Sequence, residues 1–184
     1  MISVILPTRN EPLINELITE VHKALEGYNY EIIVVDKSDV VPDIRDAKLV
    51  IQQSKGLGNA VLEGVANSKG EHIVVMDADF SHNPEDILKL LEKKDEYDIV
   101  MGRRYGEGTK SDDKLFNRVY SRFSCKTASS VLGLNMTDPL NGFALIKKEI
   151  YDKIKLNPLG YKIHMETIYK AKKLGYKITE VPTT

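Results

Sequence analysis

Short apolar runs alternate with amphipathic segments along the first half of the chain, which predicts alternating strands and helices. Because the runs are apolar throughout, each predicted strand should be covered on both faces, as in a mostly parallel sheet flanked by helices. The pattern therefore predicts an α/β fold. The predicted strands are Ile2–Leu6, Glu31–Val35, Lys48–Ile51, His72–Met76 and Asp98–Met101.

The segments between these runs predict helices. Leu13–Leu25 repeats apolar residues at helical spacing, and Gly56–Ser68 follows a glycine-containing turn. We expect Asn83 to cap a third helix, with Pro84 at its first position. The apolar face of the first helix is predicted to hold Leu13, Leu17, Ile18, Val21 and Leu25.

The second half is less regular, and we expect it to complete one domain with the first. A loop containing Gly and Asp is predicted at 106–113, and a turn at 138–142. Helices are predicted at Lys114–Leu132, Lys148–Ile154 and Ile163–Leu174, and strands at Phe143–Ile146 and Lys177–Val181.

Composition excludes several classes of protein. The formal net charge of -1 provides no basic field that would attract nucleic acid. The lone Cys125 excludes an internal disulfide and a Cys-based zinc site, and it is expected to be a buried, inert thiol. No signal peptide and no run of about 18 apolar residues occurs, so the protein is expected to be intracellular, with no membrane-spanning segment. Work at a membrane surface stays open.

Polar residues follow the predicted strands, at the edge where open α/β sheets bind ligands. Asp77-Ala78-Asp79 comes directly after HIVVM, so its two carboxylates can point at one place. A hard divalent cation takes such oxygen ligands and completes its shell with phosphates and water. A cation on a diphosphate neutralises the charge that builds on the leaving group. The triplet could also be a plain acidic turn, but the strand before it and the capped helix after it favour function.

Three other loops could border the same ligand. Asp36 ends the second strand, where it could accept hydrogen bonds from a nucleotide base or form an Asx-turn. The run 7–11 (PTRNE) could line a nucleotide pocket or be an ordinary loop. The turn 55–60 (KGLGNA) lacks both the GxxxxGK[ST] and the GxGxxG patterns, which excludes an ATP loop and a dinucleotide fingerprint. Gly58 could still let the backbone pass close to a nucleotide.

Paired arginines are candidates for a phosphate site. Arg118 and Arg122 are four residues apart on a predicted helix, so they share a face that could hold one phosphate or be a solvated basic stripe. Arg103 and Arg104, after the fifth strand, raise the same possibility nearer the sheet.

Three ionisable residues stand alone in the sequence. Glu166, at a predicted helix start, could be a general base or could stabilise the helix dipole. His82 and His164 are interpreted as capping or packing residues.

Together these motifs resemble family 2 glycosyltransferases, and within them the dolichyl-phosphate mannosyltransferase branch. The pieces follow the family's order and spacing over nearly the whole chain. They are PTRNE (7–11), GLGNA (56–60), MDADFSHNPE (76–85), GRRY (102–105), SR (121–122), DPLNGF (138–143), GYKIHME (160–166) and EVP (180–182).

The resemblance implies a nucleotide-diphospho-sugar transferase (GT-A-like) fold, with 1–105 as the nucleotide-sugar-binding half and 106–184 as the acceptor-side half. It implies transfer of a hexose, with mannose from GDP-mannose favoured, to a polyprenyl phosphate such as dolichyl phosphate, with inversion. The cofactor would be Mg²⁺ or Mn²⁺ on Asp77 and Asp79. The implied donor-binding residues are Pro7, Thr8, Asn10, Glu11, Asp36, Gly58, Asp77, Ala78 and Arg104.

The acceptor decides which other residues take part. A phosphate acceptor is already anionic near neutral pH, so it needs positioning, for which Arg118 and Arg122 are the candidates. A hydroxyl acceptor would need a base, either Glu166 or Asp138. The implied catalytic residues are therefore Asp79, Arg118, Arg122 and Glu166.

Two departures from the family pattern keep alternatives open. Asp36 is followed by Lys37 where the family has two adjacent acids, so Lys37 could itself meet a phosphate. Family members usually continue past EVP with a loop carrying Arg, Gly, Ser and Lys, whereas this sequence stops at Thr184. The alternatives are a UDP-glucose donor, a hydroxyl acceptor, or a nucleotide-sugar-binding module without turnover. A phospho-accepting receiver domain is disfavoured by the second half, and the oligomeric state stays open.

Overall fold

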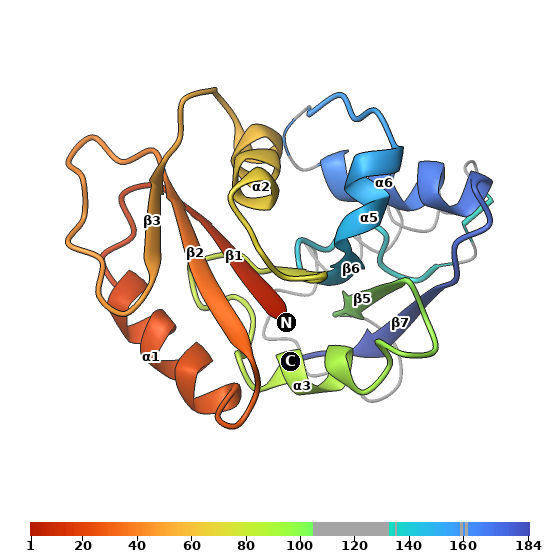
Figure 1. Ribbon diagram of the computed structural model, residues 1–184, viewed down its shortest axis with the longest axis horizontal. Coiled ribbons are helices and arrows are strands. Elements are labelled where there is room, and N and C mark those ends of the chain that lie inside the picture. Colours follow the sequence, from red (N-terminus) through yellow and green to blue (C-terminus); the bar gives the residue numbers. More distant parts are fainter. Residues whose placement is uncertain (105–132, 135, 159, 161) are drawn as a thin grey trace, which may run out of the picture.

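The first four apolar runs become neighbouring strands of a seven-stranded sheet, and a strand from the second half separates them from the fifth (Figure 1). This computed structural model describes residues 1–104, 133–134, 136–158, 160 and 162–184. The strand order is β3-β2-β1-β4-β6-β5-β7, and every pair is parallel except the two that β6 makes. The predicted α/β fold with a mostly parallel sheet is confirmed.

Each element predicted within the described residues is present, and most boundaries shift by one or two residues. The strands are β1 Ile2–Thr8, β2 Tyr30–Asp36, β3 Lys48–Ile51, β4 His72–Val75, β5 Ile99–Arg103, β6 Ala144–Lys147 and β7 Ile178–Pro182. The helices are α1 Ile14–Ala24, α2 Leu57–Ala66, α3 Asp86–Leu91, α5 Lys148–Lys153 and α6 Lys162–Lys173. The predicted loop 106–113 and helix 114–132, with Cys125, lie outside the described residues.

Helices cover both faces of the sheet, because successive strand residues point to opposite sides. On β1, Val4 and Leu6 belong to the core between the sheet and the helices α1 and α3, whereas Ile5 packs against α2 on the other face. The part of the second face formed by β5 and β6 is covered by α5 and α6. Figure 1 shows this layering, with α1 and α3 below the sheet and α2, α5 and α6 above it.

Two sequence predictions about the first strand and helix are wrong. Leu13 precedes α1 and its side chain is 48% exposed, so it does not share the buried face of Leu17. β1 continues through Pro7 to Thr8 instead of ending at Pro7. Pairing with β4 stops at Ile5, so Pro7 lies where a missing N–H removes no hydrogen bond to β4.

The start of α3 differs in detail from the predicted cap. The side chain of Asn83 does cap a turn, since its Oδ1 accepts a hydrogen bond from the N–H of Glu85 at 3.1 Å. The turn over Asn83 and Pro84 closes through bonds between residues three apart, and α3 begins only at Asp86. The proline therefore stands in a tighter turn that leads into the helix.

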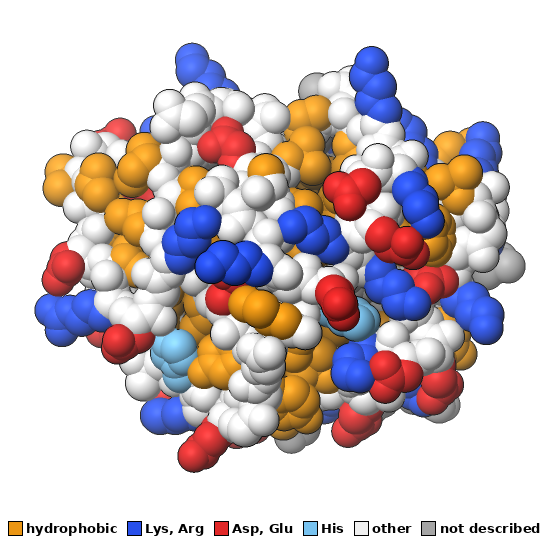
Figure 2. Space-filling model, in the orientation of Figure 1, with side chains coloured by type: hydrophobic (Ala, Val, Ile, Leu, Met, Phe, Trp, Pro, Cys, Tyr) orange, Lys and Arg blue, Asp and Glu red, His pale blue; other side chains and the backbone are white. Residues whose placement is uncertain are grey.

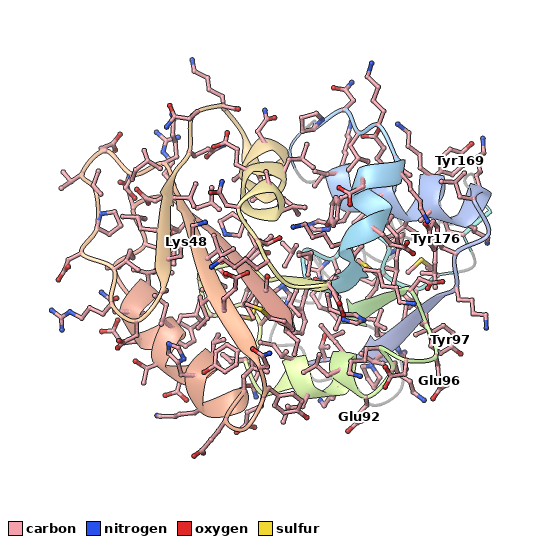
Figure 3. All side chains as sticks on the ribbon, in the orientation of Figure 1. Lys48, Glu92, Glu96, Tyr97, Tyr169 and Tyr176 are labelled. Carbon is pink, nitrogen blue, oxygen red and sulfur yellow. The ribbon has the colours of Figure 1, made fainter. Side chains whose placement is uncertain are left out.

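One tyrosine on α6 and one in the turn after it border the core of the second half. Tyr169 and Tyr176 are half-buried against that core and are labelled in Figure 3. The Nζ atom of Lys173 lies 4.5 Å from the ring centroid of Tyr169, and that of Lys153 lies 5.6 Å from the Tyr176 ring. Lysine stems thus cover aromatic faces that solvent would otherwise reach.

Basic and acidic side chains are interspersed over the face shown in Figure 2, without a large area of either sign. None of the helices within the described residues has the length and apolar character needed to cross a membrane.

Candidate active site

A pocket of about 520 Å³ lies at the carboxyl ends of β2 and β3. Its charged lining combines three cations with the carboxylates of Asp36 and Asp39, and Val41 and Ile51 provide an apolar wall. The three cations are Arg9, Lys37 and Lys55. Apolar side chains can lie against a base while cations balance phosphate charge. The pocket therefore has the chemistry of a nucleotide site, at the sheet edge where the sequence predicts one.

Asp36 lies at the floor of this pocket and is almost fully buried. Its carboxylate accepts hydrogen bonds from the N–H of Ser38 at 3.1 Å and from the Ser38 hydroxyl at 2.5 Å. This is the Asx-turn alternative, and it holds the carboxylate in place without using all of its acceptor capacity. Thr8, the register partner of Asp36, has a buried hydroxyl with no hydrogen-bond partner among the described residues.

The 7–11 loop is bound to the loop after β2. Asn10 has a left-handed backbone (φ 56°), and its side chain exchanges hydrogen bonds with Asp39 at 2.9 and 3.0 Å. Glu11 turns its carboxylate back to the N–H of Leu13 at 3.2 Å. Lys37 donates to the carbonyl oxygen of Gln52 at 2.8 Å, so its ammonium is directed at the protein backbone. These contacts shape the pocket wall.

Gly58 lies in close packing contact with Pro158. A β-carbon at Gly58 would lie 2.9 Å from the carbonyl carbon of Pro158. The missing side chain therefore lets α2 meet the segment before α6. The approach of Gly58 to a nucleotide stays a prediction.

Asp77 and Asp79 follow β4, at the same sheet edge as the pocket. Ala78 between them is buried, Asp77 is half-buried, and Asp79 is exposed with its Oδ1 accepting from the N–H of Ser81 at 3.0 Å. No cluster of three or more His, Cys, Asp or Glu side chains suited to a metal occurs within the described residues. Two carboxylates fit a hard cation that takes its other oxygen ligands from a diphosphate and water.

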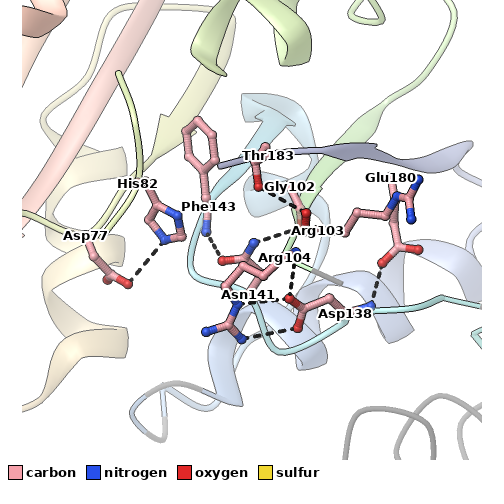
Figure 4. Close-up of polar contacts among 10 residues, drawn as sticks. All are labelled: Asp77, His82, Gly102, Arg103, Arg104, Asp138, Asn141, Phe143, Glu180 and Thr183. Carbon is pink, nitrogen blue, oxygen red and sulfur yellow. Dashed lines mark hydrogen bonds and ion pairs between the residues drawn. The ribbon is translucent and has the colours of Figure 1, made fainter. Parts of the chain in front are cut away.

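His82 lies beside Asp77, which the interpretation of His82 as an isolated capping or packing residue missed. Its Nε2 is 3.6 Å from Asp77 Oδ2, and its ring stacks on Phe143 with centroids 5.1 Å apart (Figure 4). The contact with His82 holds the pKa of Asp77 below its usual range, against the opposing effect of burial. Gly142 also touches this carboxylate, because a β-carbon there would lie 2.8 Å from Oδ2.

His164, on α6, is a second buried histidine near this carboxylate. Burial lowers its pKa to about 4, with Asp77 opposing and His82 reinforcing that shift. Its Nδ1 has no hydrogen-bond partner among the described residues. His164 is therefore neutral at physiological pH.

The pKa of His164 predicts a pH-dependent stability in the metal-free protein. Because the folded pKa lies below the unfolded value, the unfolded chain binds the proton first, and stability falls as the pH drops from about 6.5 toward 4. The loss approaches about 3 kcal/mol at the acid end. Urea unfolding in EDTA across this range should show a shallower pH slope for His164→Gln than for the wild type. Equal pH slopes in the variant and the wild type would contradict the assignment of this pH dependence to His164.

Arg104 belongs to a buried polar network rather than standing open to a donor. Its Nε and backbone N–H both donate to Asp138 Oδ2, at 3.0 and 3.2 Å (Figure 4). Asp138 is fully buried, and its own N–H donates to Glu180 on β7 at 2.7 Å. Asn141 bonds the carbonyl of Gly102 at 2.9 Å. The network ties the 138–142 turn to β5 and β7.

Glu166 lies in the second turn of α6, so its predicted place at the helix start is wrong. Its carboxylate accepts hydrogen bonds from the N–H of Asn157 at 3.0 and 3.1 Å and pairs with Lys170 at 2.5 Å. These contacts anchor the 157–158 segment to α6. Arg118 and Arg122 lie outside the described residues.

Comparison with solved structures identifies the fold. Glucosyl-3-phosphoglycerate synthase from Mycobacterium tuberculosis, solved with Mn²⁺, UDP and phosphoglyceric acid, superposes with a TM-score of 0.77. The two chains are 23% identical, and the match covers 99% of this chain and 68% of the other. The same enzyme with Mg²⁺ and UDP gives a TM-score of 0.75 at 21% identity, covering 99% and 69% of the two chains. The chain thus has the GT-A fold.

Curated relatives carry one name. Dolichol-phosphate mannosyltransferase from Pyrococcus furiosus is 36% identical over 100% of this chain and 56% of its own length. The protein of that name from Saccharomyces cerevisiae is 29% identical over 91% of this chain and 70% of its own. This chain therefore spans little more than half of the Pyrococcus furiosus relative. Residues 3–155 match the model of glycosyl transferase family 2. The fold of this chain and the carboxylates after β4 are consistent with that match. The chain belongs to glycosyl transferase family 2.

Proposed function

We propose that this protein transfers mannose from GDP-mannose to a polyprenyl phosphate such as dolichyl phosphate, with inversion at the anomeric carbon. The observation that carries the proposal is the Asp77–Asp79 pair, at the same sheet edge as the 520 Å³ pocket, in a family 2 chain. The name shared by the curated relatives supports the mannosyl donor and the lipid phosphate acceptor.

The donor would lie across the first half, residues 1–105. Its base would occupy the pocket beside Asp36, with Val41 and Ile51 against the ring and Arg9 and Lys55 near the phosphates. Mg²⁺ or Mn²⁺ bound through Asp77 and Asp79 would neutralise charge on the departing diphosphate. Structures of the fold relative hold Mn²⁺ or Mg²⁺ together with UDP, which supports a divalent cation at this position.

The state of the two candidate bases supports a phosphate acceptor over a hydroxyl acceptor. Asp138 is fully buried and paired with Arg104, and Glu166 is occupied by Asn157 and Lys170. A hydroxyl acceptor needs a base with room to take its proton, whereas a phosphate already carries negative charge near neutral pH. The acceptor would meet the second half, residues 106–184, at a membrane surface.

A two-stage experiment tests the proposal. First, thermal unfolding is compared with GDP-mannose and with UDP-glucose, each with and without Mn²⁺, because ligand stabilisation grows as RT ln(1 + [L]/Kd). We expect the larger shift with GDP-mannose and Mn²⁺. Second, radiolabelled mannose transfer to a short polyprenyl phosphate is measured in detergent. Donor binding without transfer would favour a nucleotide-sugar-binding module. A larger shift of the thermal midpoint with UDP-glucose would overturn the assignment of GDP-mannose as the donor.

Arg122→Ala is expected to cut transfer by about one to two decades while leaving donor binding unchanged. Arg118 and Arg122 are one predicted helical turn apart, and a charge-assisted hydrogen bond to phosphate contributes about 1.5–3 kcal/mol. Arg122→Lys should restore transfer only in part, because an ammonium lacks the planar fork of a guanidinium. Lys23→Ala, which removes an exposed charge on α1, is the matched control. An equal loss of donor affinity in Arg122→Ala would contradict an acceptor role.

A further inference from the structure

The carboxylate of Asp77 is bordered on one side by a buried histidine. The side chain of His82 is only 3% exposed, and its Nε2 lies 3.6 Å from Asp77 Oδ2. A carboxylate can only accept, so an attractive contact between these two atoms needs a proton on Nε2. The Nδ1 atom of His82 is buried and has no hydrogen-bond partner among the described residues. The fully buried ring of Phe143 stacks on the imidazole at an interplanar angle of 22° and fixes its plane.

The second border comes from the chain before β6. A β-carbon at Gly142 would lie 2.8 Å from Asp77 Oδ2, so the carboxylate fills the space that a side chain would need. Asn141 fixes this stretch, since its side chain donates to the carbonyl of Gly102 and accepts from the N–H of Phe143. The 141–143 segment therefore carries the ring that stacks on His82, seen in Figure 4, and the glycine whose position the Asp77 carboxylate borders.

The two oxygens of Asp77 are not equivalent in this surrounding. Oδ2 is the oxygen that lies 3.6 Å from His82 Nε2, and it is also the nearer of the two to the position of a β-carbon on Gly142, at 2.8 Å against 3.2 Å for Oδ1. The side chain remains 32% exposed, which leaves it open to a ligand. A carboxylate held through one oxygen can offer the other to a cation without first losing its own rotational freedom.

We propose that His82 is a positioning residue that holds Asp77 through Oδ2, with the 141–143 segment as its support, so that Asp77 offers Oδ1 to the divalent cation. The inference rests on the proposed function, because it takes Asp77 as a ligand of the cation on the donor diphosphate. His82 itself touches neither the cation nor the donor.

Two substitutions separate the polar contact of His82 with Asp77 from the packing of its ring on Phe143. His82→Phe keeps a ring to stack on Phe143 but removes the donor, and His82→Gln keeps an N–H donor but removes the ring. Partners that orient a metal ligand typically contribute 10–100-fold to metal affinity. With GDP present, Mn²⁺ affinity measured by electron paramagnetic resonance should fall about 10–100-fold in His82→Phe and by less in His82→Gln.

The controls remove a purely structural explanation. GDP affinity in EDTA and the thermal midpoint of His82→Phe should stay close to those of the wild type. Gly142→Ala would place a β-carbon 2.8 Å from Oδ2 and 3.2 Å from Oδ1 of Asp77, so it should displace the carboxylate and also weaken Mn²⁺ affinity. Unchanged Mn²⁺ affinity in His82→Phe would overturn the positioning role. A GDP affinity that falls equally in EDTA and in Mn²⁺ would overturn it as well.

A ligand-free measurement tests the contact apart from the function. Nitrogen-15 NMR of the histidine rings should show His82 with its proton on Nε2, and Asp77→Asn should shift that resonance. A proton on Nδ1 would overturn the inference even in a protein that binds GDP. If the wild type binds neither GDP nor Mn²⁺, the proposed function fails, and the cation role of Asp77 fails with it.

Discussion

Asp79→Ala is expected to abolish metal-dependent donor binding and to lower mannose transfer by about three decades. A cation on the diphosphate contributes several kcal/mol of charge stabilisation to the departing group, and about 1.4 kcal/mol corresponds to a factor of ten. Stability should barely change, because Asp79 is exposed and its one hydrogen bond from the described residues comes from the N–H of Ser81. The loss would therefore be one of function.

Calorimetry of GDP binding with and without Mn²⁺ measures this effect directly. Wild-type protein should bind more tightly with Mn²⁺, and Asp79→Ala should bind equally in both conditions. Asp95→Ala is the matched control, since it removes another exposed carboxylate that lies after α3. A full Mn²⁺ response in Asp79→Ala would sink the assignment of this residue to the cation.

The sequence predicts the sheet well because strand signals are local. β3 has the predicted boundaries, and Asp36 and Asp77 fall at strand ends as expected, since apolar runs and the polar residues that follow them are adjacent in the chain. β1 is longer than predicted because Pro7 is compatible with the strand at this position. Its missing N–H would cost a hydrogen bond only if β4 still paired with β1 there, and that pairing has already stopped at Ile5. That neighbour is set by tertiary structure.

The surroundings of the site depend on partners that are far away in sequence. His82 meets Phe143 only because β4 and β6 pair antiparallel, and no local pattern around either residue indicates the pairing. Gly58 meets Pro158 by the same kind of long-range packing. The motifs predict candidate residues from local sequence, whereas the contacts of each, such as the hydrogen bond from Asn157 to Glu166, depend on the fold.

Asp138→Ala is expected to lower the free energy of unfolding by about 3 kcal/mol. Asp138 is fully buried and accepts from Arg104 through Nε, a terminal guanidinium nitrogen and the backbone N–H. Its removal leaves buried donors without that acceptor. The figure stays at the low end of the range for broken buried pairs because Arg104 is 35% exposed and can still reach water.

Thermal unfolding should show this as a fall of roughly 6–12 °C in the midpoint, given about 2–4 °C per kcal/mol for a chain of this size. Asp152→Ala, which removes an exposed carboxylate on α5, should change the midpoint little. The result also separates two roles for Asp138. If Asp138 is structural, Asp138→Ala lowers stability, and the protein that stays folded below the thermal midpoint keeps most of its turnover. A general base for a hydroxyl acceptor would instead lose turnover at unchanged stability, and that outcome would reopen the choice of acceptor, because the phosphate assignment rests on Asp138 being held by Arg104.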